Sequence, residues 1–206
     1  MDTAYERQTE LKLIPPSAHG LDADFSPPSM MLLDLLRQRH SSREFVPRPL
    51  PLHTLSRLLW AAFGINRPLD GGRTAPSARN EQEITIYVAQ ADGLYRFEPN
   101  GLSLQPVLDQ DLRGATGLQD FVAEAPLNLV YVATLLPEAE LGEQEQMFCA
   151  ALDTGFIGQN VYLFCAAEGL STVVRGWIDR PALAARMGLG PQQRIIAAQT
   201  IGYPRG

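Results

Sequence analysis

Hydrophobic positions along the first and last thirds of the chain recur at helical spacing. Residues 30–40 (MMLLDLLRQRH) carry leucines on one helical side, and residues 52–63 (LHTLSRLLWAAF) repeat that pattern up to Gly64. Residues 143–169 predict one long helix of about 40 Å, because a helix rises about 1.5 Å per residue. This helix is mostly apolar in its second half, and Gly169 is expected to end it.

Apolar runs bounded by turn residues predict strands between and after these helices. The predicted strands are residues 83–90, 94–99, 102–109, 127–134, 171–176 and 194–204. Asp92-Gly93 and Asn100-Gly101 give the turns between the first three. A short helix precedes the last strand, with Asp179 as its N-cap and Pro181 in its first turn. Helices and strands interleave without regular βαβ alternation, which predicts an α+β fold.

The beginning of the chain lacks this periodicity. Residues 14–30 are rich in proline, so residues 1–29 are predicted to form an extended N-terminal arm. Residues 30–206 are predicted to form a single domain, which a chain of 206 residues readily accommodates. Between the second helix and the first strand, residues 65–82 are dense in Gly, Pro, Asn and Ser, and a loop of this length usually carries function.

Composition and charge exclude several classes of partner. Hydrophobic residues make up 45% of the chain and charged residues 19%, as in a soluble globular protein. The formal net charge of −6 argues against nucleic acid or an anionic membrane surface as a partner. Polar residues within the long helix exclude a membrane span. They are Asp153, Gln159, Asn160 and Glu168. The N-terminus lacks the features of a signal peptide, so the expected compartment is the cytoplasm.

The sequence contains no self-sufficient catalytic or metal-binding motif. HExxH, GxSxG, GxxxxGK[ST] and a GxGxxG after a strand are all missing. His19, His40 and His53 are scattered, so no metal site is expected. Cys149 and Cys165 lie in the long apolar helix and are expected to be buried thiols. A bound organic cofactor is therefore the expected source of any chemistry.

Two short segments offer groups that such a cofactor would need. In RHSSREF, Arg39 and Arg43 stand four residues apart and can grip one phosphate, with Ser41 and His40 as further donors. In TAPSARNEQE, Asn80 presents a donor and an acceptor in one plane, which matches the imide edge of a flavin or pyrimidine. Each segment alone also fits an ordinary solvated helix end or a turn-rich loop.

Taken together, RHSSREF, LLWAAFGINRP, GRTAPSARNEQEITIYVA, GFIGQNVYLFCAAEGLSTVVRG and IGYP resemble the nitroreductase family of FMN flavoproteins. The resemblance covers residues 30–204 and is greatest to the thiazole/oxazole-oxidase-like (SagB/ThcOx-type) branch. It implies an α+β sandwich of a mixed, mostly antiparallel sheet with flanking helices. It also implies an intertwined homodimer with one FMN at each of two sites made by both subunits.

Small residues in the long helix bear on that dimer, because they allow another helix to approach closely. They are Ala150, Ala151, Thr154, Gly155 and Gly158. Their pattern fits a buried core helix as well as it fits a dimer seam.

The resemblance further implies which residues hold FMN. Phosphate, ribityl chain and pyrimidine edge would be held by Arg39, His40, Ser41 and Arg43. The isoalloxazine ring would lie near Pro76, Ser77 and Asn80, with the backbone of Arg175 and Gly176 facing flavin N5. Arg205 is the candidate for a phosphate contact that relatives make through a basic residue after GYP. Arg175 and Glu83 stand where many relatives have other residue types, and Arg175 is expected to alter the charge of the pocket.

The function implied is that of an FMN-dependent oxidoreductase working by a ping-pong scheme. NAD(P)H would deliver hydride to flavin N5, and a small aromatic or quinone-like acceptor would then remove the electrons. A missing dinucleotide fingerprint suits a nicotinamide that only visits. Dehydrogenation of a peptide thiazoline or oxazoline ranks lower, because it needs a lysine and tyrosine set and Lys12 is the only lysine. The same segments are also compatible with a non-catalytic flavin-binding protein, or with surface features of an unrelated α+β domain.

Overall fold

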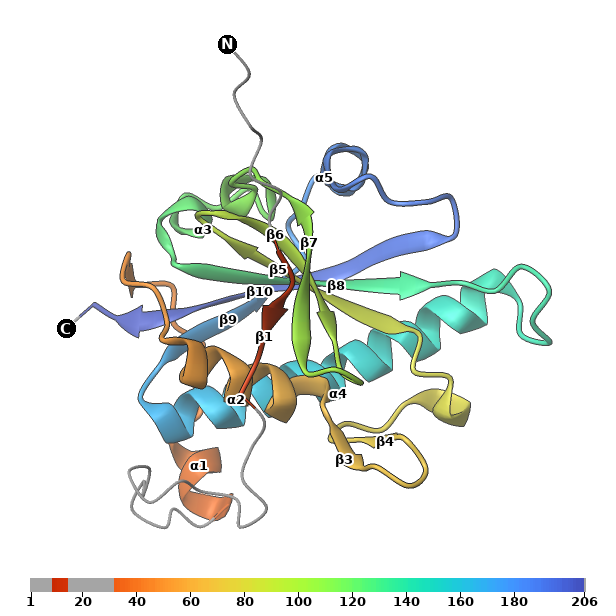
Figure 1. The fold of residues 1–206 in the computed structure, drawn as a ribbon, viewed down its shortest axis with the longest axis horizontal. Coiled ribbons are helices and arrows are strands. Elements are labelled where there is room, and N and C mark those ends of the chain that lie inside the picture. Colours follow the sequence, from red (N-terminus) through yellow and green to blue (C-terminus); the bar gives the residue numbers. More distant parts are fainter. Residues whose placement is uncertain (1–8, 15–31, 206) are drawn as a thin grey trace.

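The computed structural model describes residues 9–14 and 32–205, and within them an eight-stranded sheet forms the centre of the molecule (Figure 1). The strand order is β1-β7-β6-β5-β8-β10-β2, and β9 also pairs with β10. The strands are β1 Leu11–Lys12, β2 Phe45–Val46, β5 Ile84–Gln90, β6 Gly93–Glu98, β7 Ser103–Leu108, β8 Leu127–Thr134, β9 Ser171–Arg175 and β10 Gln193–Pro204. Separately, β3 Ile65–Arg67 and β4 Gly72–Arg73 form a small hairpin.

Helices cover both faces of the sheet (Figure 1). They are α1 Leu32–Gln38, α2 Leu52–Phe63, α3 Phe121–Glu124, α4 Glu143–Glu168 and α5 Arg180–Met187, with short 3-10 turns η1 Ala78–Asn80 and η2 Arg113–Ala115. One core lies between the sheet and α2 and α4, and a second core lies under α5. In β8, Leu129 and Tyr131 belong to the first core, and Val130 and Val132 to the second. Because both faces of β8 are buried, its sequence from Leu129 to Ala133 is a continuous apolar run.

The predicted α+β class is confirmed, and most predicted elements are present within a residue or two. Every pairing among the described strands is antiparallel, so this part of the sheet is not mixed. Gly169 ends α4 in the left-handed conformation with φ 65°, and Asp179 caps α5 by accepting the N–H of Ala182. Gly64 ends α2, but its backbone is extended, and a Cβ there would lie 2.5 Å from Trp60 Cδ1.

Several features differ from the sequence-based expectations. The predicted loop 65–82 contains the β3–β4 hairpin, and the predicted arm contributes β1, which pairs with β7. The rest of that arm, and the start of the first helix at residue 30, lie outside the described residues. Cys165 is buried as expected, whereas Cys149 is only partly buried. Within the described ranges no helix is both long and apolar enough to cross a membrane.

Arg175 is the last residue of β9, and only 4% of its surface is exposed. Its Nε donates to Thr200 Oγ1 at 2.8 Å, its Nη1 to the Thr116 carbonyl at 2.9 Å, and its Nη2 to Asn128 Oδ1 at 2.9 Å. These partners are neutral, and burial lowers the pKa of the guanidinium to about 10. Gly117 leaves room for this group, since a Cβ there would collide with Arg175 Nη1. The side chain of Arg175 therefore links β9 to β8, to β10 and to the segment after η2 inside the protein.

We expect Arg175→Lys to lower the free energy of unfolding by about 2 kcal/mol or more. A single ammonium cannot replace a fork that reaches three separated acceptors, and unpaired buried oxygens are costly. Urea unfolding followed by circular dichroism measures the change. Arg186→Lys, on the exposed side of α5, is the matched control and should change stability by less than about 0.5 kcal/mol. Equal stability of both variants would contradict a structural role for the buried fork.

Candidate functional site

The segment after α1 is fixed against the edge of β9 by a tyrosine that the sequence analysis missed. Tyr162, on α4, accepts the backbone N–H of Val174 at 3.0 Å, and its hydroxyl lies 2.8 Å from Ser41 Oγ. The Ser42 N–H donates to the Thr172 carbonyl at 3.0 Å. Residues 39–43 are thus anchored beside β9 by both side-chain and backbone bonds. An aromatic residue with a polar tip within an apolar helix was the available signal for Tyr162.

No acid within residues 9–14 or 32–205 neutralises Arg39 or Arg43. The Arg39 guanidinium lies over the Tyr162 ring, 5.5 Å from its centroid, and has no ion-pair partner in the described part of the chain. Arg43 is exposed and likewise has no ion pair or hydrogen bond to a described residue. The nearby Asp34 instead pairs with Arg37 at 2.8 Å. Arg39 and Arg43 are therefore available for an anion.

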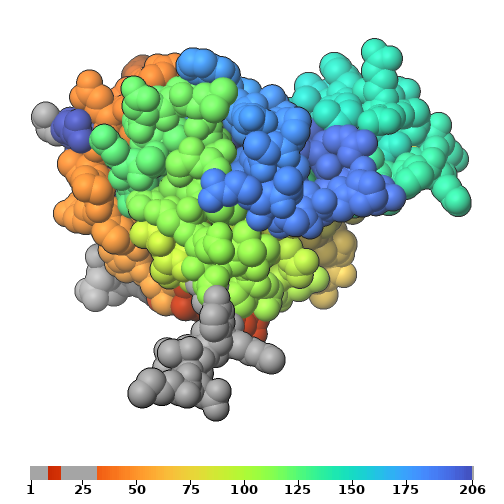
Figure 2. Space-filling model, turned by 90° about the horizontal axis from the view of Figure 1, so that it is seen from above, coloured from red at the N-terminus to blue at the C-terminus, as the bar shows by residue number. Residues whose placement is uncertain are grey.

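His40 and Arg205 lie at the margin of this cluster. His40 Nδ1 is 2.8 Å from the Gln38 carbonyl, which leaves Nε2 of the exposed ring open. The pairing of β10 with β2 sets Pro204 opposite Phe45, so Arg205 follows next to Glu44. Figure 2 shows the dark-blue C-terminal end against the orange surface at this place. Arg205 is exposed and makes a 3.3 Å ion pair with Glu124, a contact weak enough to exchange for another anion.

Beyond this anchored segment, the free edge of β9 presents a backbone donor. The Thr172 carbonyl and the Val174 N–H both point away from β10, toward residues 41–42 and Tyr162. Because backbone groups alternate in direction along a strand, the next N–H on this edge is that of Gly176. Gly176 is exposed, and a Cβ added there would meet nothing within 4 Å. This edge could therefore donate a hydrogen bond to a ligand lying on it.

The loop of residues 76–82, called the asparagine loop below, contacts a different part of α4 from residues 39–43. Asp153 Oδ2 accepts the N–H of the first residue of η1 at 2.8 Å, which attaches the loop to the helix. Asn80 has φ 56°, and its Oδ1 accepts the side-chain amide of Gln82 at 3.0 Å. Ser77 Oγ accepts the Gln82 N–H at 3.0 Å, so that hydroxyl supports the loop. Pro76 is exposed beside it.

The structure places residues 39–43 along the outer edge of β9. Gly176 lies past one end of β9, opposite Ala197, whereas Arg205 lies past the other end, eight residues or about 26 Å farther along β10. Asn80 is separate from both. Tyr162 and Asp153, which anchor the two groups, are nine residues apart on α4, or about 13 Å along its axis and half a turn around it. A ligand that contacts both groups must be elongated, with an anionic end near Arg39 and Arg43.

A carboxyl pair lies under the asparagine loop and was also missed. Glu83 has both carboxyl oxygens buried without a hydrogen-bond partner in the described chain, and Asp153 is only 1% exposed. Burial raises the pKa of Glu83 to about 7, and the neighbouring carboxyl of Asp153 acts in the same direction. Glu83 therefore lies against Asp153 on α4, the helix to which the asparagine loop is attached.

This chain belongs to the nitroreductase family, whose profile matches residues 36–203. A Methanocaldococcus jannaschii protein, provisionally named a nitroreductase, is 32% identical over 155 residues, covering 70% of this chain and 78% of that protein. A crystal structure of a protein with the same provisional name from Ralstonia eutropha JMP134 is 42% identical, with a TM-score of 0.87, covering 97% of this chain and 91% of that one.

A more distant structure shares the fold alone. It is the NADPH:FMN oxidoreductase of Vibrio harveyi in complex with NAD+, with a TM-score of 0.63 and 19% identity. The match covers 84% of this chain and 69% of that one.

We expect stability to fall as the pH rises from about 5 to about 8, because Glu83 must ionise in the folded protein. Its pKa is raised from 4.5 to about 7 on folding, so the folded state binds more protons between these values. Glu83→Gln should flatten this dependence and gain roughly 1 to 2 kcal/mol at about pH 8, a figure reduced for solvent screening of the half-buried carboxyl. Urea unfolding at several pH values tests this. Exposed Glu138→Gln should follow the parent protein; a Glu83→Gln curve parallel to it would refute the assignment.

Proposed function

We propose that this chain is an FMN-dependent oxidoreductase in which residues 39–43 hold the phosphate end of the flavin. The observation that carries the proposal is the pair of guanidinium groups of Arg39 and Arg43, which have no acidic partner among the described residues, whereas Asp34 pairs with Arg37. A phosphate would supply the missing negative charge through charged hydrogen bonds. The relative from Vibrio harveyi, an NADPH:FMN oxidoreductase, supports this class of cofactor.

The position of the cluster suits side-chain recognition of a phosphate. Residues 39–43 follow the C-terminus of α1, where the helix dipole disfavours an anion and no free helical N–H groups are available. Binding there must rely on arginine forks and on the hydroxyl of Ser41, which Tyr162 holds in place. The residues present therefore fit a phosphate monoester.

FMN, when bound, would supply hydride transfer from NAD(P)H to a small aromatic or quinone-like acceptor in a ping-pong scheme. The protein's own groups would tune and orient it. The Gly176 N–H is placed to donate to the ring edge, and Arg39 and His40 would stabilise negative charge on the reduced ring. Asn80, with its amide N–H groups open, would recognise a planar donor and acceptor edge. No side-chain base is required, which agrees with the missing catalytic motifs.

Azoline dehydrogenation, which would follow from the SagB/ThcOx-type resemblance, ranks lower because of where Lys12 lies. It belongs to β1 at one end of the sheet order, whereas β10 and β2 lie at the other end. Its ammonium pairs with Glu10 at 2.6 Å. The single lysine is thus outside the cluster that contains Arg39.

The visible spectrum of the purified protein, with the mass of any released chromophore, tests the proposal. We expect the released chromophore to have the mass of FMN, and the purified yellow protein to bleach anaerobically with NADH or NADPH and to recolour with a quinone. Bound flavin that neither nucleotide bleaches would instead indicate a flavin-binding protein. A protein that stays colourless after incubation with FMN would overturn the whole assignment.

Combined Arg39→Ala and Arg43→Ala should weaken FMN binding by at least about a hundredfold, because each of the two charged hydrogen bonds contributes about 1.5 to 3 kcal/mol. Fluorescence titration of apoprotein with FMN measures this. Arg37→Ala is the matched control: it removes an arginine from the same segment, but one already paired with Asp34. An equal loss in both variants would mean that general positive charge, and not this pair, matters.

The exposed side of α4 supports the predicted homodimer. Phe148, Leu152 and Phe156 recur every four residues and are 63%, 47% and 46% exposed. Of the small residues, Ala150, Thr154 and Gly158 are buried in the core, whereas Ala151 and Gly155 are exposed beside the apolar stripe. We propose that this stripe packs against a second copy of the chain, since a row of large apolar side chains marks an interaction surface.

Leu152→Glu combined with Phe156→Glu should convert the dimer to a monomer, because burying carboxylates in an apolar seam is strongly unfavourable. Light scattering coupled to gel filtration measures the mass. Gln144→Glu, an exposed position on the same helix, should leave the dimer intact. A parent protein that is monomeric, or a double variant that remains dimeric, would place the interface elsewhere.

A further inference from the structure

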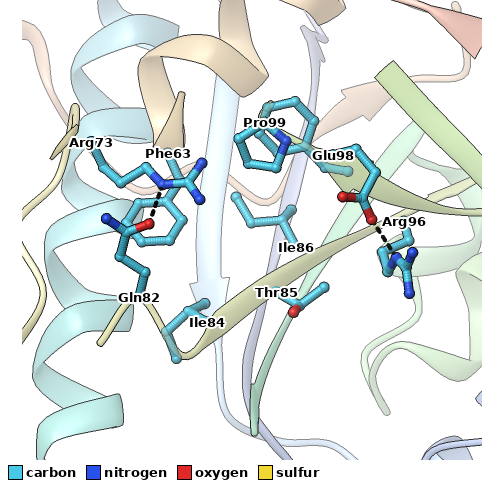
Figure 3. A pocket seen from close by; sticks show the side chains of 10 residues that line it. Phe63, Arg73, Gln82, Ile84, Thr85, Ile86, Arg96, Glu98 and Pro99 are labelled. Atoms are coloured by element: carbon cyan, nitrogen blue, oxygen red, sulfur yellow. Dashed lines mark hydrogen bonds and ion pairs between the residues drawn. The ribbon is translucent and has the colours of Figure 1, made fainter. Parts of the chain in front are cut away.

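A cavity of about 330 Å³ opens where β5 and β6 separate (Figure 3). The two strands pair only from Tyr87 and Arg96 to Gln90 and Gly93. Before Tyr87, residues 84–86 of β5 pair with β8 and not with β6. After Arg96, residues 97–98 of β6 pair with β7 and not with β5. The cavity lies in this fork, and α2 and the β3–β4 hairpin close it from the side. Its walls are Phe63, Arg73, Gln82, Ile84, Thr85, Ile86, Arg96, Phe97, Glu98 and Pro99. None of them belongs to the cluster around Arg39.

Arg73 is the polar group that the cavity leaves unsatisfied. Its Nε donates to Gln82 Oε1 at 2.8 Å, and its guanidinium lies 5.3 Å from the centroid of the Phe63 ring. Its Nη1 is buried and has no hydrogen-bond partner among the described residues. Figure 3 shows the guanidinium extending from the hairpin toward the middle of the cavity, in the direction of Ile86. A partly buried cation with an unpaired donor gains from an anion placed against it.

The charges of the cavity wall sum to one positive charge. Arg96 and Glu98 form an ion pair with an Nε to Oε1 distance of 2.6 Å, and they neutralise each other. Arg73 remains, and it is close enough to Glu98 to feel its charge without an ion pair. Ile86 and Phe97 lie behind the wall, only 1% and 3% exposed, so the surface open to a ligand comes mainly from polar side chains and Pro99.

We propose that this cavity binds a small monocarboxylate through Arg73. One negative charge matches the single uncompensated cation, and a carboxylate fits the planar fork of a guanidinium. The rest of the acid would lie against the partly exposed, uncharged residues Thr85 and Pro99. A phosphate dianion fits less well, since it would bring a second negative charge next to Glu98 without a second free cation.

Gln82 connects this cavity to the loop that carries Asn80. Its Oε1 accepts from Arg73, and its Nε2 donates to Asn80 Oδ1 at 3.0 Å and to the Gly71 carbonyl at 3.1 Å. Asn80 and Gln82 both have positive φ, 56° and 53°, so the loop is held in a conformation that these bonds must sustain. A carboxylate on Arg73 would therefore act next to the bond network that orients Asn80.

Isothermal titration of the protein as purified with benzoate tests the site, with benzamide as the uncharged control ligand. We expect benzoate to bind and benzamide to bind at least about tenfold more weakly, as the loss of a charged hydrogen bond implies. Arg73→Met should weaken benzoate binding by a similar factor. Glu98→Gln should tighten it several-fold, because it removes the negative charge next to the ligand. Opposite effects of two substitutions in one cavity cannot arise from poor folding.

The variant with Arg39→Ala and Arg43→Ala should bind benzoate as the parent protein does, since those residues lie outside the cavity. Loss of benzoate binding in that variant, or unchanged binding in Arg73→Met, would place the benzoate at the flavin cluster and overturn the proposal. No binding to the parent protein would do the same. Displacement of benzoate by equimolar inorganic phosphate would show a general anion site and reject the monocarboxylate.

Discussion

Strand β10 must satisfy its backbone hydrogen bonds over twelve residues, and the candidate site depends on how it does so. It pairs with β8 over most of its length, with β9 on the other side from Ala198 to Gly202, and with β2 at Tyr203 and Pro204. This one strand therefore brings β9 and the segment after α1 to the same end of the sheet. Residues 39–43 lie along the same edge of β9 as the Gly176 N–H because Ser42 bonds to Thr172 and Tyr162 links Ser41 to Val174.

Beneath that end, buried polar side chains connect the layers. Gln199, fully buried, accepts the Tyr131 hydroxyl at 2.6 Å and donates to Thr172 Oγ1 at 3.1 Å, so it joins β8, β10 and β9. Arg175 joins β9 to Thr116 and Asn128 through buried hydrogen bonds. Fully satisfied networks of this kind fix a single arrangement of the elements that they join. The edge that carries Gly176 is thus a rigid support.

Much of this architecture could be predicted from local patterns, but β9 could not be oriented from them. The periodicities of α2 and α4 and the apolar run of β8 each reflect burial that repeats along one element. In β9, by contrast, Val174 is exposed and Arg175 is buried, the reverse of what polarity alone indicates. The reason is that Thr116, Asn128 and Thr200, far apart in sequence, supply neutral oxygens to the guanidinium. Likewise, the anchoring of residues 39–43 by Tyr162 depends on a contact across 121 residues from Ser41, which no local signal reveals.

The edges of the sheet restrict how this protein can associate with other chains. An unpaired strand edge readily recruits a further strand, which leads to aggregation or domain swapping. In the described part of the chain, β1 lies along β7, and the bond from Ser42 occupies the middle of β9. Each of these contacts shortens the stretch of edge that a foreign strand could pair with. Specific association is therefore directed to side chains on helices, where shape and polarity can discriminate between partners, and away from backbone pairing, which cannot.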